Sequence, residues 1–425
     1  MAQVAGSPGE RRHAAGQGHP CRSCGAPLEH TVVDLGMSPL CESYLTADQL
    51  NRMEPFYPLR VHVCQHCLLV QLQEYVSPEE IFTEYAYFSS YSTSWVDHAR
   101  RYTELAVRRL GLGAGSLVVE LASNDGYLLQ HFVALGVPVL GIEPARNVAA
   151  AAEAKGVPTR TAFFGAELAE QLVAEGKWVD LIVANNVLAQ VPDLNDFVAG
   201  MRILLGEQAV ATVEFPHLAS LFAENQFDTI YHEHFSYFSL LAAQRVFSAQ
   251  GLTVFDVEEL ATHGGSLRLW LRHDADTSKP VASSVDALLE GERAAGFNRL
   301  DHYLSFGPKV EATKRKLLAF LIQAREDGKR VAGYGAPGKG NTLLNYCGIR
   351  TDLLDYTVDR NPYKQGRFLP GTHIPIFEPA WITETRPDYV LILPWNLRDE
   401  VVQQLAHVRD WGARFVVPIP EVRVS

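Results

Sequence analysis

The chain has 425 residues and a formal net charge of −12 at pH 7, with 47% hydrophobic and 20% charged residues. The length predicts roughly two to four domains, and the composition is typical of a globular protein. The negative charge disfavours a protein that wraps nucleic acid, and no apolar run reaches the ~18 residues of a membrane span. Residues 1–19 lack the apolar core of a signal peptide, so we expect a disordered tail on a cytoplasmic protein.

Two C-x2-C pairs lie in residues 20–78, where we expect a first module. The pairs are Cys21 with Cys24 and Cys64 with Cys67, and 39 residues separate them. Two such pairs can complete a tetrahedral zinc site, although the separation exceeds that of simple zinc ribbons. Four protein ligands leave no open position, which predicts a structural zinc; two unrelated reduced pairs are the alternative. The other two cysteines are interpreted as ordinary buried residues, Cys41 and Cys347.

Strand-like and helix-like stretches alternate over residues 79–265, which predicts a parallel, doubly wound sheet of the α/β class. The strand-like runs are "SLVVELA", "PVLGIEP", "DLIVANNVL" and "AVATVEFP". Glu120 ends the first strand, a turn at 124–126 leads into a helix, and Glu143 ends the second strand. Ligands of such sheets lie at the carboxyl ends of the strands, where an acid can accept hydrogen bonds from both ribose hydroxyls.

The turn after the first strand decides between two kinds of ligand. A dinucleotide fingerprint has three glycines, whereas this turn has only Gly126. The pattern Glu120-x-Ala122-x-Asn124-x-Gly126 instead resembles motif I of class I methyltransferases, with Ala122 and Asn124 at usual glycine positions. A ligand-free α/β unit is the alternative interpretation.

Residues 266–425 predict a second Rossmann-like unit. A strand-like "SLRLWLRH" and a largely helical stretch (286–327) precede "RVAGYGA", "LDYTVD", "DYVLILP" and "RFVVPIP". The loop at 333–340 carries four glycines and Lys339, and Asp359 follows. By spacing this is the better dinucleotide fingerprint of the two, and its N–H groups at a helix start suit any diphosphate.

Residues 231–239, "YHEHFSYFS", gather two histidines, a glutamate and two tyrosines. The run alone fits aromatic packing and an acid/base site equally well. Its order with other stretches is more specific: four cysteines, "YAYFSSYSTSW", "VVELASNDGYLL", "GIEPA", "YHEHFSYFS", "THGGSLR" and "YGAPGKGNTLLNYCGI". This set resembles the nucleotide-sugar C-methyltransferases of deoxysugar biosynthesis in actinobacterial antibiotic pathways, over nearly the whole chain beyond residue 20.

The resemblance implies an N-terminal zinc module, a central S-adenosylmethionine domain and a C-terminal Rossmann-like domain. It implies methylation of a ring carbon next to the C4 ketone of a TDP-linked sugar, usually C3 and in some cases C5. That chemistry needs a base at the carbon and a hydrogen-bond donor at the ketone oxygen. We expect His234 to be the base, Tyr231 the donor, and Glu233 to orient the histidine or bind the sugar, with His232 structural.

At two further positions of the family pattern, this chain matches the family at one and departs from it at the other. Tyr85 stands where the family has an active-site tyrosine. Gln190 stands where the family often has a histidine, and a glutamine can hydrogen-bond but cannot hold a proton charge. A mechanism that needs a proton donor or acceptor at this position therefore fails in this chain, unless a neighbouring residue takes that role.

The motifs and the resemblance together give a set of binding residues. For S-adenosylmethionine these are Glu120, Ala122, Asn124, Asp125, Gly126, Glu143, Pro144, Asn185 and Asn186. For the TDP-linked 4-keto-deoxysugar they are Tyr334, Gly335, Lys339, Gly340, Asn341, His263 and Ser266. We expect a monomer without nucleic-acid or membrane partners, which holds the nucleotide-sugar between its last two domains without NAD. The alternatives are an NAD-dependent nucleotide-sugar oxidoreductase or epimerase, and a zinc-ribbon binding module with degenerate Rossmann units.

Overall fold

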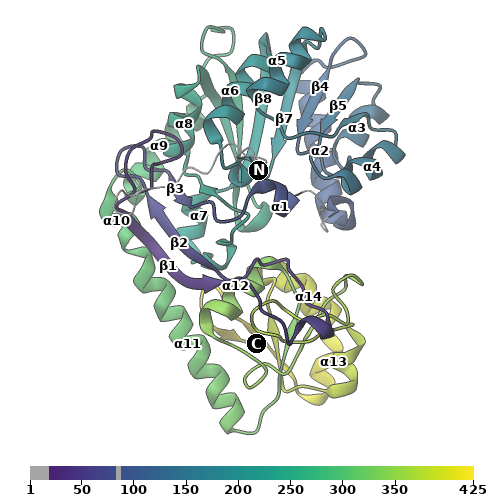
Figure 1. Cartoon of the computed structure of the whole chain (residues 1–425), viewed down its shortest axis with the longest axis vertical. Helices are drawn as coiled ribbons and strands as arrows, with labels where there is room; N and C mark the ends of the chain where they lie inside the picture. The colour runs from purple at the N-terminus through teal and green to yellow at the C-terminus, as the bar shows by residue number, and fades with distance from the viewer. Residues whose placement is uncertain (1–18, 83–87) are drawn as a thin grey trace, which may run out of the picture.

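The computed structural model describes residues 19–82 and 88–425, which form three sheets (Figure 1). In this view the central sheet lies at the top, the C-terminal sheet at the bottom, and the N-terminal sheet at the left between them. The long helix α11 (Phe306–Glu326) runs past the N-terminal sheet to the C-terminal domain. Within the described ranges, no helix is long and apolar enough to cross a membrane.

The N-terminal module is a small antiparallel sheet that a distant part of the chain completes. Its own strands are β1 (His30–Ser38), β2 (Tyr57–Val63) and β3 (Val70–Leu72). The free edge of β3 pairs with β9 (Ser236–Tyr237), which gives the order β1-β2-β3-β9. The stretch with the predicted acid/base residues is therefore hydrogen-bonded to the cysteine-bearing module. Two short helices follow β1 and β3, η1 (Ala47–Gln49) and α1 (Pro78–Phe82).

The central domain holds a seven-stranded sheet in the order β10-β11-β8-β7-β4-β5-β6. The five strands from β8 to β6 are parallel, which confirms the predicted doubly wound sheet, and their order places a topological switch beside β4. These strands are β4 (Val118–Leu121), β5 (Val139–Ile142), β6 (Thr159–Arg160), β7 (Val179–Asn185) and β8 (Leu205–Pro216). The helices are α2 (Thr93–Leu110), α3 (Leu129–Ala134), α4 (Arg146–Ala154), α5 (Ala166–Ala174), α6 (Leu194–Leu204), α7 (Leu218–Ala223) and α8 (Leu240–Ala249).

The sheet continues past residue 265, where we expected the central domain to end. The strand β11 (Ser266–His273) lies antiparallel between β8 and β10 (Leu252–Leu260). The connection between β10 and β11 contains Gly264 and Gly265, whose φ angles are 87° and 117°. Glycine tolerates this conformation, so the chain can reverse there and keep both strands in one sheet.

Helix α2 shows how the sequence places side chains beside the carboxyl ends of the strands. Ser92 caps its start by accepting the Trp95 N–H at 3.4 Å, and Gly111 ends it with φ 66°. The buried face of this helix consists of Ala99, Tyr102, Thr103 and Ala106, at the spacing of an amphipathic helix. Trp95, in the first turn of the helix, lies beside the carboxyl ends of the strands.

The C-terminal domain is the predicted second Rossmann-like unit. Its six-stranded sheet has the order β14-β13-β12-β15-β16-β17, with five parallel strands and an antiparallel last strand. The strands are β12 (Val331–Tyr334), β13 (Thr357–Val358), β14 (Ile376–Phe377), β15 (Tyr389–Ile392), β16 (Arg414–Val417) and β17 (Arg423–Val424). The helices that precede or accompany the sheet are α9 (Ser283–Ala295), α10 (Leu300–Leu304), α12 (Gly338–Cys347), α13 (Ala380–Thr385) and α14 (Arg398–Gln404).

The segment after β1 packs on the glycine loop of the C-terminal domain. The Tyr44 hydroxyl donates a hydrogen bond to the Ala336 carbonyl at 2.6 Å. A Cβ on Gly338 would lie 2.8 Å from the Sγ of Cys41. Gly338 therefore provides room for the N-terminal module, independently of any phosphate group.

We predict that Gly338→Ala lowers stability by about 1–3 kcal/mol, the usual effect of overpacking. Cys41→Ala should restore most of the loss in the double variant, because it removes the sulfur that the new methyl group meets. Gly291→Ala in α9 is the control, since no heavy atom of the described residues beyond the helix's own backbone lies within 4 Å of its added Cβ, and it should be neutral or stabilising. Thermal unfolding of the four variants measures the effect, and additive losses would refute the contact.

Candidate active site

A cavity of about 530 Å³ lies where the three modules meet. Its walls include the carboxyl ends of β5 and β7, the stretch 231–234, the start of α12, and Cys41 and Glu42 of the N-terminal module. Tyr85 lies outside the described residues. The predicted site residues that line the cavity are Ala122, Asn124, Glu143, Pro144, Asn185, Asn186, Gln190, Tyr231, Glu233, His234, His263 and Lys339.

The turn after β4 has the backbone conformation that its glycine-like positions require. Ala122 and Asn124 adopt φ angles of 56° and 49°, and Gly126 adopts 75°. Alanine is strained by about 1–2 kcal/mol in this left-handed region. A Cβ on Gly126 would lie 3.0 Å from Val157 Cγ2, so the turn also packs closely on the following unit. The structure thus explains why this position remains a glycine while the other two do not.

Glu143 is held by backbone groups at the end of β5. Its Oε2 accepts the Asn124 N–H at 2.9 Å, and its Oε1 accepts the Ala145 N–H at 2.8 Å. Burial raises the pKa of Glu143, and these two hydrogen bonds oppose the shift. Each carboxylate oxygen can accept more than one hydrogen bond, so the side chain retains capacity for the hydroxyls of a ribose.

Three predicted cofactor residues do not line the cavity. Glu120 is fully buried, and burial, followed by the nearby Glu143, raises its pKa well above the ordinary value. Asp125 forms an ion pair with Lys155 at 2.8 Å. Gly126 contributes its backbone conformation. These residues shape the turn behind the wall that a ligand would touch.

Asparagine side chains at the end of β7 provide polar atoms without partners. Within the described part of the chain, the Oδ1 and Nδ2 of Asn185 and the Oδ1 of Asn186 are buried and form no hydrogen bond. The Nδ2 of Asn186 lies 3.4 Å from Nε2 of His263. Buried amides are costly unless a partner is supplied, so these atoms fit a polar ligand that completes their hydrogen bonds.

Sequence analysis missed one wall of the cavity. Ala162, Phe163 and Phe164 follow β6 and line the cavity, and Trp95 lines it from α2. β6 has only two residues, so no hydrophobic alternation marks it as a strand. The signal that could have found this wall is position, because residues after the third strand of a doubly wound sheet lie at the same edge as Glu143.

The stretch 231–234 forms a tight turn that sends its two histidines to different sides. The His234 N–H donates to the Tyr231 carbonyl at 2.9 Å. The Nε2 of His232 donates to the Pro58 carbonyl at 3.2 Å, so this side chain packs on the N-terminal module and does not line the cavity. Tyr231 and His234 both line the cavity, with ring centroids 4.1 Å apart. The turn separates the histidines into a structural one and a candidate base.

Burial favours the uncharged forms of His234 and Tyr231. The Nδ1 of His234 lies 3.0 Å from the Thr229 carbonyl, which assigns the proton to Nδ1 and leaves a lone pair on Nε2. Burial lowers the pKa of His234 to about 4. Burial also raises the pKa of Tyr231 well above its ordinary value. The pair therefore consists of a neutral imidazole and a protonated phenol at neutral pH.

Two other predicted residues complete the wall beside this turn. The Oε1 of Glu233 accepts a weak hydrogen bond from Cys41 Sγ at 3.7 Å. Cys41 is buried, as expected, and it also lines the cavity, which sequence analysis did not foresee. Gln190 ends the short helix η3 (Leu188–Gln190), and the neighbouring Ala189 carbonyl accepts the Phe235 N–H at 2.7 Å.

Of the predicted substrate residues of the C-terminal domain, one lines the main cavity. Lys339, in the first turn of α12, lines the cavity; its Nζ lies 4.6 Å from the Trp395 ring centroid and burial lowers its pKa. Tyr334 lines a second cavity, and its hydroxyl donates to Gln404 at 2.8 Å. The other predicted residues, which do not line the main cavity, are Gly335, Gly340, Asn341 and Ser266.

The acid of the second glycine motif is already hydrogen-bonded within the protein. Asp359 accepts the Ala336 N–H at 2.6 Å through Oδ2 and the Asn361 N–H at 2.8 Å through Oδ1. The Cβ of a residue at Gly340 would lie 2.9 Å from Leu393, so this glycine allows α12 to pack on the sheet. The loop is thus organised by contacts inside the chain.

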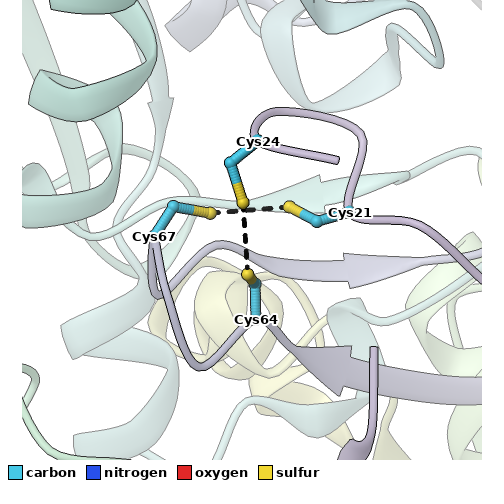
Figure 2. A group of neighbouring side chains, drawn as sticks. All are labelled: Cys21, Cys24, Cys64 and Cys67. Atoms are coloured by element: carbon cyan, nitrogen blue, oxygen red, sulfur yellow. Dashed lines mark hydrogen bonds between the residues drawn. The ribbon is translucent and has the colours of Figure 1, made fainter. Parts of the chain in front are cut away.

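The four predicted zinc ligands form one cluster (Figure 2). Their sulfur atoms all lie within 4.8 Å of one another, and Cys21–Cys67 and Cys24–Cys64 are each 3.5 Å apart. The second pair lies between β2 and β3, and the sheet brings it against the first pair despite the long sequence separation. The donor set and its geometry fit Zn²⁺.

Comparison with known proteins agrees with each module. Residues 21–82 match a zinc binding domain, 95–257 a methyltransferase domain, and 261–420 a C-methyltransferase C-terminal domain. The C-methyltransferase NovU of Streptomyces niveus is 37% identical over 404 residues, which cover 95% of this chain and 96% of that protein. The chain belongs to this family of C-methyltransferases. It is an S-adenosylmethionine-dependent enzyme with a four-cysteine zinc-binding site.

Comparison with solved structures also found methyltransferases, at low sequence identity and low TM-score. An S-adenosylmethionine-dependent methyltransferase from Clostridium acetobutylicum is 9% identical, with a TM-score of 0.34, over 42% of this chain and 92% of that one. The magnesium protoporphyrin IX methyltransferase of Synechocystis was solved with bound S-adenosylmethionine. It is 16% identical, with a TM-score of 0.31, over 42% of this chain and 78% of that one.

We predict about one zinc per chain by metal analysis of this C-methyltransferase. Cys24→Ser should lose zinc and unfold at lower temperature, because metal binding contributes directly to folding stability. Cys347→Ala is the matched control, since Cys347 is a buried cysteine outside the cluster, and it should keep its zinc. A folded, zinc-free Cys24→Ser variant with wild-type stability would contradict a structural role.

We predict that Glu143→Ala weakens S-adenosylmethionine binding by about 1–3 kcal/mol, because the ligand's polar groups lose their partner. Affinity for TDP, the nucleotide that the family resemblance implies, should stay unchanged, since Glu143 follows β5 of the central sheet and Lys339, the expected nucleotide-binding residue, belongs to the C-terminal domain. Glu167→Ala, an exposed acid on α5, is the control. Calorimetry with both ligands tests this, and equal losses for both would mean that Glu143 serves the fold.

Proposed function

We propose that this C-methyltransferase methylates a ring carbon next to the C4 ketone, C3, of a TDP-linked 4-keto-deoxysugar in antibiotic deoxysugar biosynthesis. One observation carries the proposal: a single cavity contains Glu143 and Asn185 of the central sheet, Tyr231 and His234 of the turn, and Lys339 of α12. A methyl donor, an acid/base pair and an anion-binding group can therefore act on one substrate. S-adenosylmethionine, when bound, supplies an electrophilic methyl group and needs no metal activation.

The proposed reaction begins with proton removal from the carbon beside the ketone. Nε2 of His234 is the acceptor, because Nδ1 is engaged with Thr229 and the lone pair of Nε2 is available. Proton loss places negative charge on the ketone oxygen, and the protonated Tyr231 hydroxyl can donate a hydrogen bond to it there. The carbon then carries the electron pair that would form the new bond to the methyl group, while the sulfur of the methyl donor would keep the electrons of the broken sulfur–methyl bond and leave as a neutral thioether.

The diphosphate is the part of the substrate that the C-terminal domain would bind. Lys339 supplies a cation at the start of α12, where the backbone N–H groups of the first helical turn also favour an anion. Burial lowers the pKa of Lys339, so a bound diphosphate would offset the desolvation of this ammonium group. Lys364 lines the same cavity, where it lies 3.7 Å from Glu42 and donates to the Ala336 carbonyl.

The experiment that tests the function is product analysis after incubation with S-adenosylmethionine and a panel of TDP-4-keto sugars. Mass spectrometry should show the gain of one methyl group, and NMR should place it on C3. A methyl group on C5 would support the alternative within the family. Consumption of NAD(P)H without methylation would support the nucleotide-sugar oxidoreductase alternative and refute the proposal.

We predict that His234→Gln lowers turnover by about 10²–10⁴-fold while both ligands still bind, since a positioned base contributes that much. The variant should also stop washing deuterium into the sugar at the acidified carbon. Tyr231→Phe should lower turnover by removing the donor to the enolate oxygen, yet keep the base. Wild-type exchange in His234→Gln would remove His234 as the base and make Tyr231 or Glu233 the first candidate.

The pH dependence follows from the same histidine. Its pKa of about 4 means that it stays neutral from neutral pH down to about pH 5. We therefore expect the acid limb of kcat/KM near pH 4 instead of near the ordinary histidine value. Because the folded pKa lies below the unfolded one, the same group should stabilise the fold above about pH 6.5 and lose that contribution as pH falls towards 4.

We predict that Lys339→Ala weakens TDP binding, and that the loss is larger at low salt because ions screen charge pairs. Lys316→Ala, an exposed lysine on α11, is the control and should leave TDP affinity unchanged. Calorimetry at two salt concentrations measures both variants. If Lys339→Ala binds TDP as tightly as wild type, the diphosphate lies elsewhere.

A further inference from the structure

Arg22 lies between two zinc ligands, Cys21 and Cys24, yet its side chain contacts the walls of the active-site cavity. Its Nη1 donates to the Pro192 carbonyl at 3.1 Å, and its Nη2 donates to the Leu72 carbonyl. Pro192 itself lines the cavity. One guanidinium group therefore bridges the last residue of β3 and the segment that follows Gln190.

The same guanidinium lies over the chain that leaves the catalytic turn 231–234. Its Cζ is 5.4 Å from the centroid of the Phe235 ring. The Phe235 carbonyl accepts the Leu72 N–H at 2.9 Å, and the Phe235 N–H donates to the Ala189 carbonyl at 2.7 Å. Arg22, Leu72, Phe235 and the segment 189–192 thus form a closed circuit of hydrogen bonds around one side of the cavity.

The zinc cluster fixes the backbone from which this side chain extends. The Arg22 N–H donates to Oε1 of Gln71 at 3.0 Å, and Nε2 of Gln71 donates to Cys21 Sγ at 3.1 Å. The Ser23 carbonyl accepts Nδ2 of Asn195 at 2.9 Å, which ties the same knuckle to the start of α6. Zinc binding at Cys21 and Cys24 would hold this short segment in one conformation.

We propose that Arg22 is a positioning residue for methyl transfer, which sets the separation between the catalytic turn and the segment 189–192. The inference rests on the proposed roles of His234 and Tyr231. A planar guanidinium can donate to two carbonyls at fixed angles while its face lies on an aromatic ring, and an ammonium group cannot. Misplacing a base by about 1 Å can cost roughly 100-fold in rate. The zinc knuckle thereby contributes to catalysis through geometry without contact with substrate.

The test compares Arg22→Met and Arg22→Lys with Arg60→Met, an exposed arginine on β2 of the same sheet whose partner is Asp34. In Arg22→Met we expect zinc content and S-adenosylmethionine affinity to stay at wild-type values. The kcat should fall by about 10- to 100-fold, and the KM for the nucleotide-sugar should change far less. Arg22→Lys should be intermediate, and Arg60→Met should match wild type.

Hydrogen exchange measured by mass spectrometry gives a readout that needs no sugar. Peptides over 186–193 and 231–238 should exchange faster in Arg22→Met, while peptides over β4 and β5 should not change. Unchanged exchange and kcat with zinc bound would overturn the inference. Zinc loss in Arg22→Met and Arg22→Lys alike would also overturn it, because the residue would then serve only the metal site. If wild type methylates no sugar of the panel, the proposed function fails, whereas the exchange result still decides the role of Arg22.

Discussion

The pairing of β3 with β9 is the contact on which the rest of the site depends. β9 has only two residues, and it begins two positions after the turn 231–234, which holds the candidate base. In a sheet, a slip of one residue turns every side chain to the opposite face, so the register of this short ladder determines where the preceding turn directs His234 and His232. The second cysteine pair leads directly into β3. The metal site, the small sheet and the candidate base therefore form one mechanical unit, although they come from opposite ends of the first 240 residues.

Burial of that unit has a chemical consequence. In a site with little water, the uncharged forms of a histidine and a tyrosine are favoured, and both pKa shifts have this direction. These are the forms that a carbon deprotonation requires at its start: a free lone pair and a hydroxyl that still has its proton. Burial also strengthens a hydrogen bond to an oxygen that gains charge. Among the described residues the buried amide of Asn185 has no hydrogen-bond partner, which fits a polar ligand at this place.

The sequence predicted those parts of the fold that short-range patterns encode. The strands β4, β5, β7 and β8 are apolar runs between turn signals, and the three left-handed positions after β4 follow from a motif within seven residues. It did not predict contacts between distant segments. β9 is too short for a periodic signal, β11 looks like the start of a new unit until its hairpin with β10 is seen, and the side chains of Arg22 and Cys41 carry no local sign of what they touch. The distinction between His232 and His234 depends on a turn, and only the packed structure specifies which side each ring occupies.

The loops after β4 and β12 also show that a sequence motif does not specify contacts with distant segments. In the first, Glu143 at the end of the second strand anchors the turn and still faces the cavity. In the second, Asp359 accepts hydrogen bonds from the Ala336 and Asn361 N–H groups. The Ala336 carbonyl in turn accepts hydrogen bonds from Tyr44 and Lys364. A glycine motif in the sequence specifies the conformation of a loop. Whether a ligand can reach that loop depends on the segments that pack on it. The N-terminal module also contacts the second loop, through Tyr44 at Ala336 and Cys41 at Gly338. The dinucleotide-like motif is therefore a place where the N-terminal and C-terminal modules pack together, and the first turn of α12 with Lys339 is the part that lines the cavity.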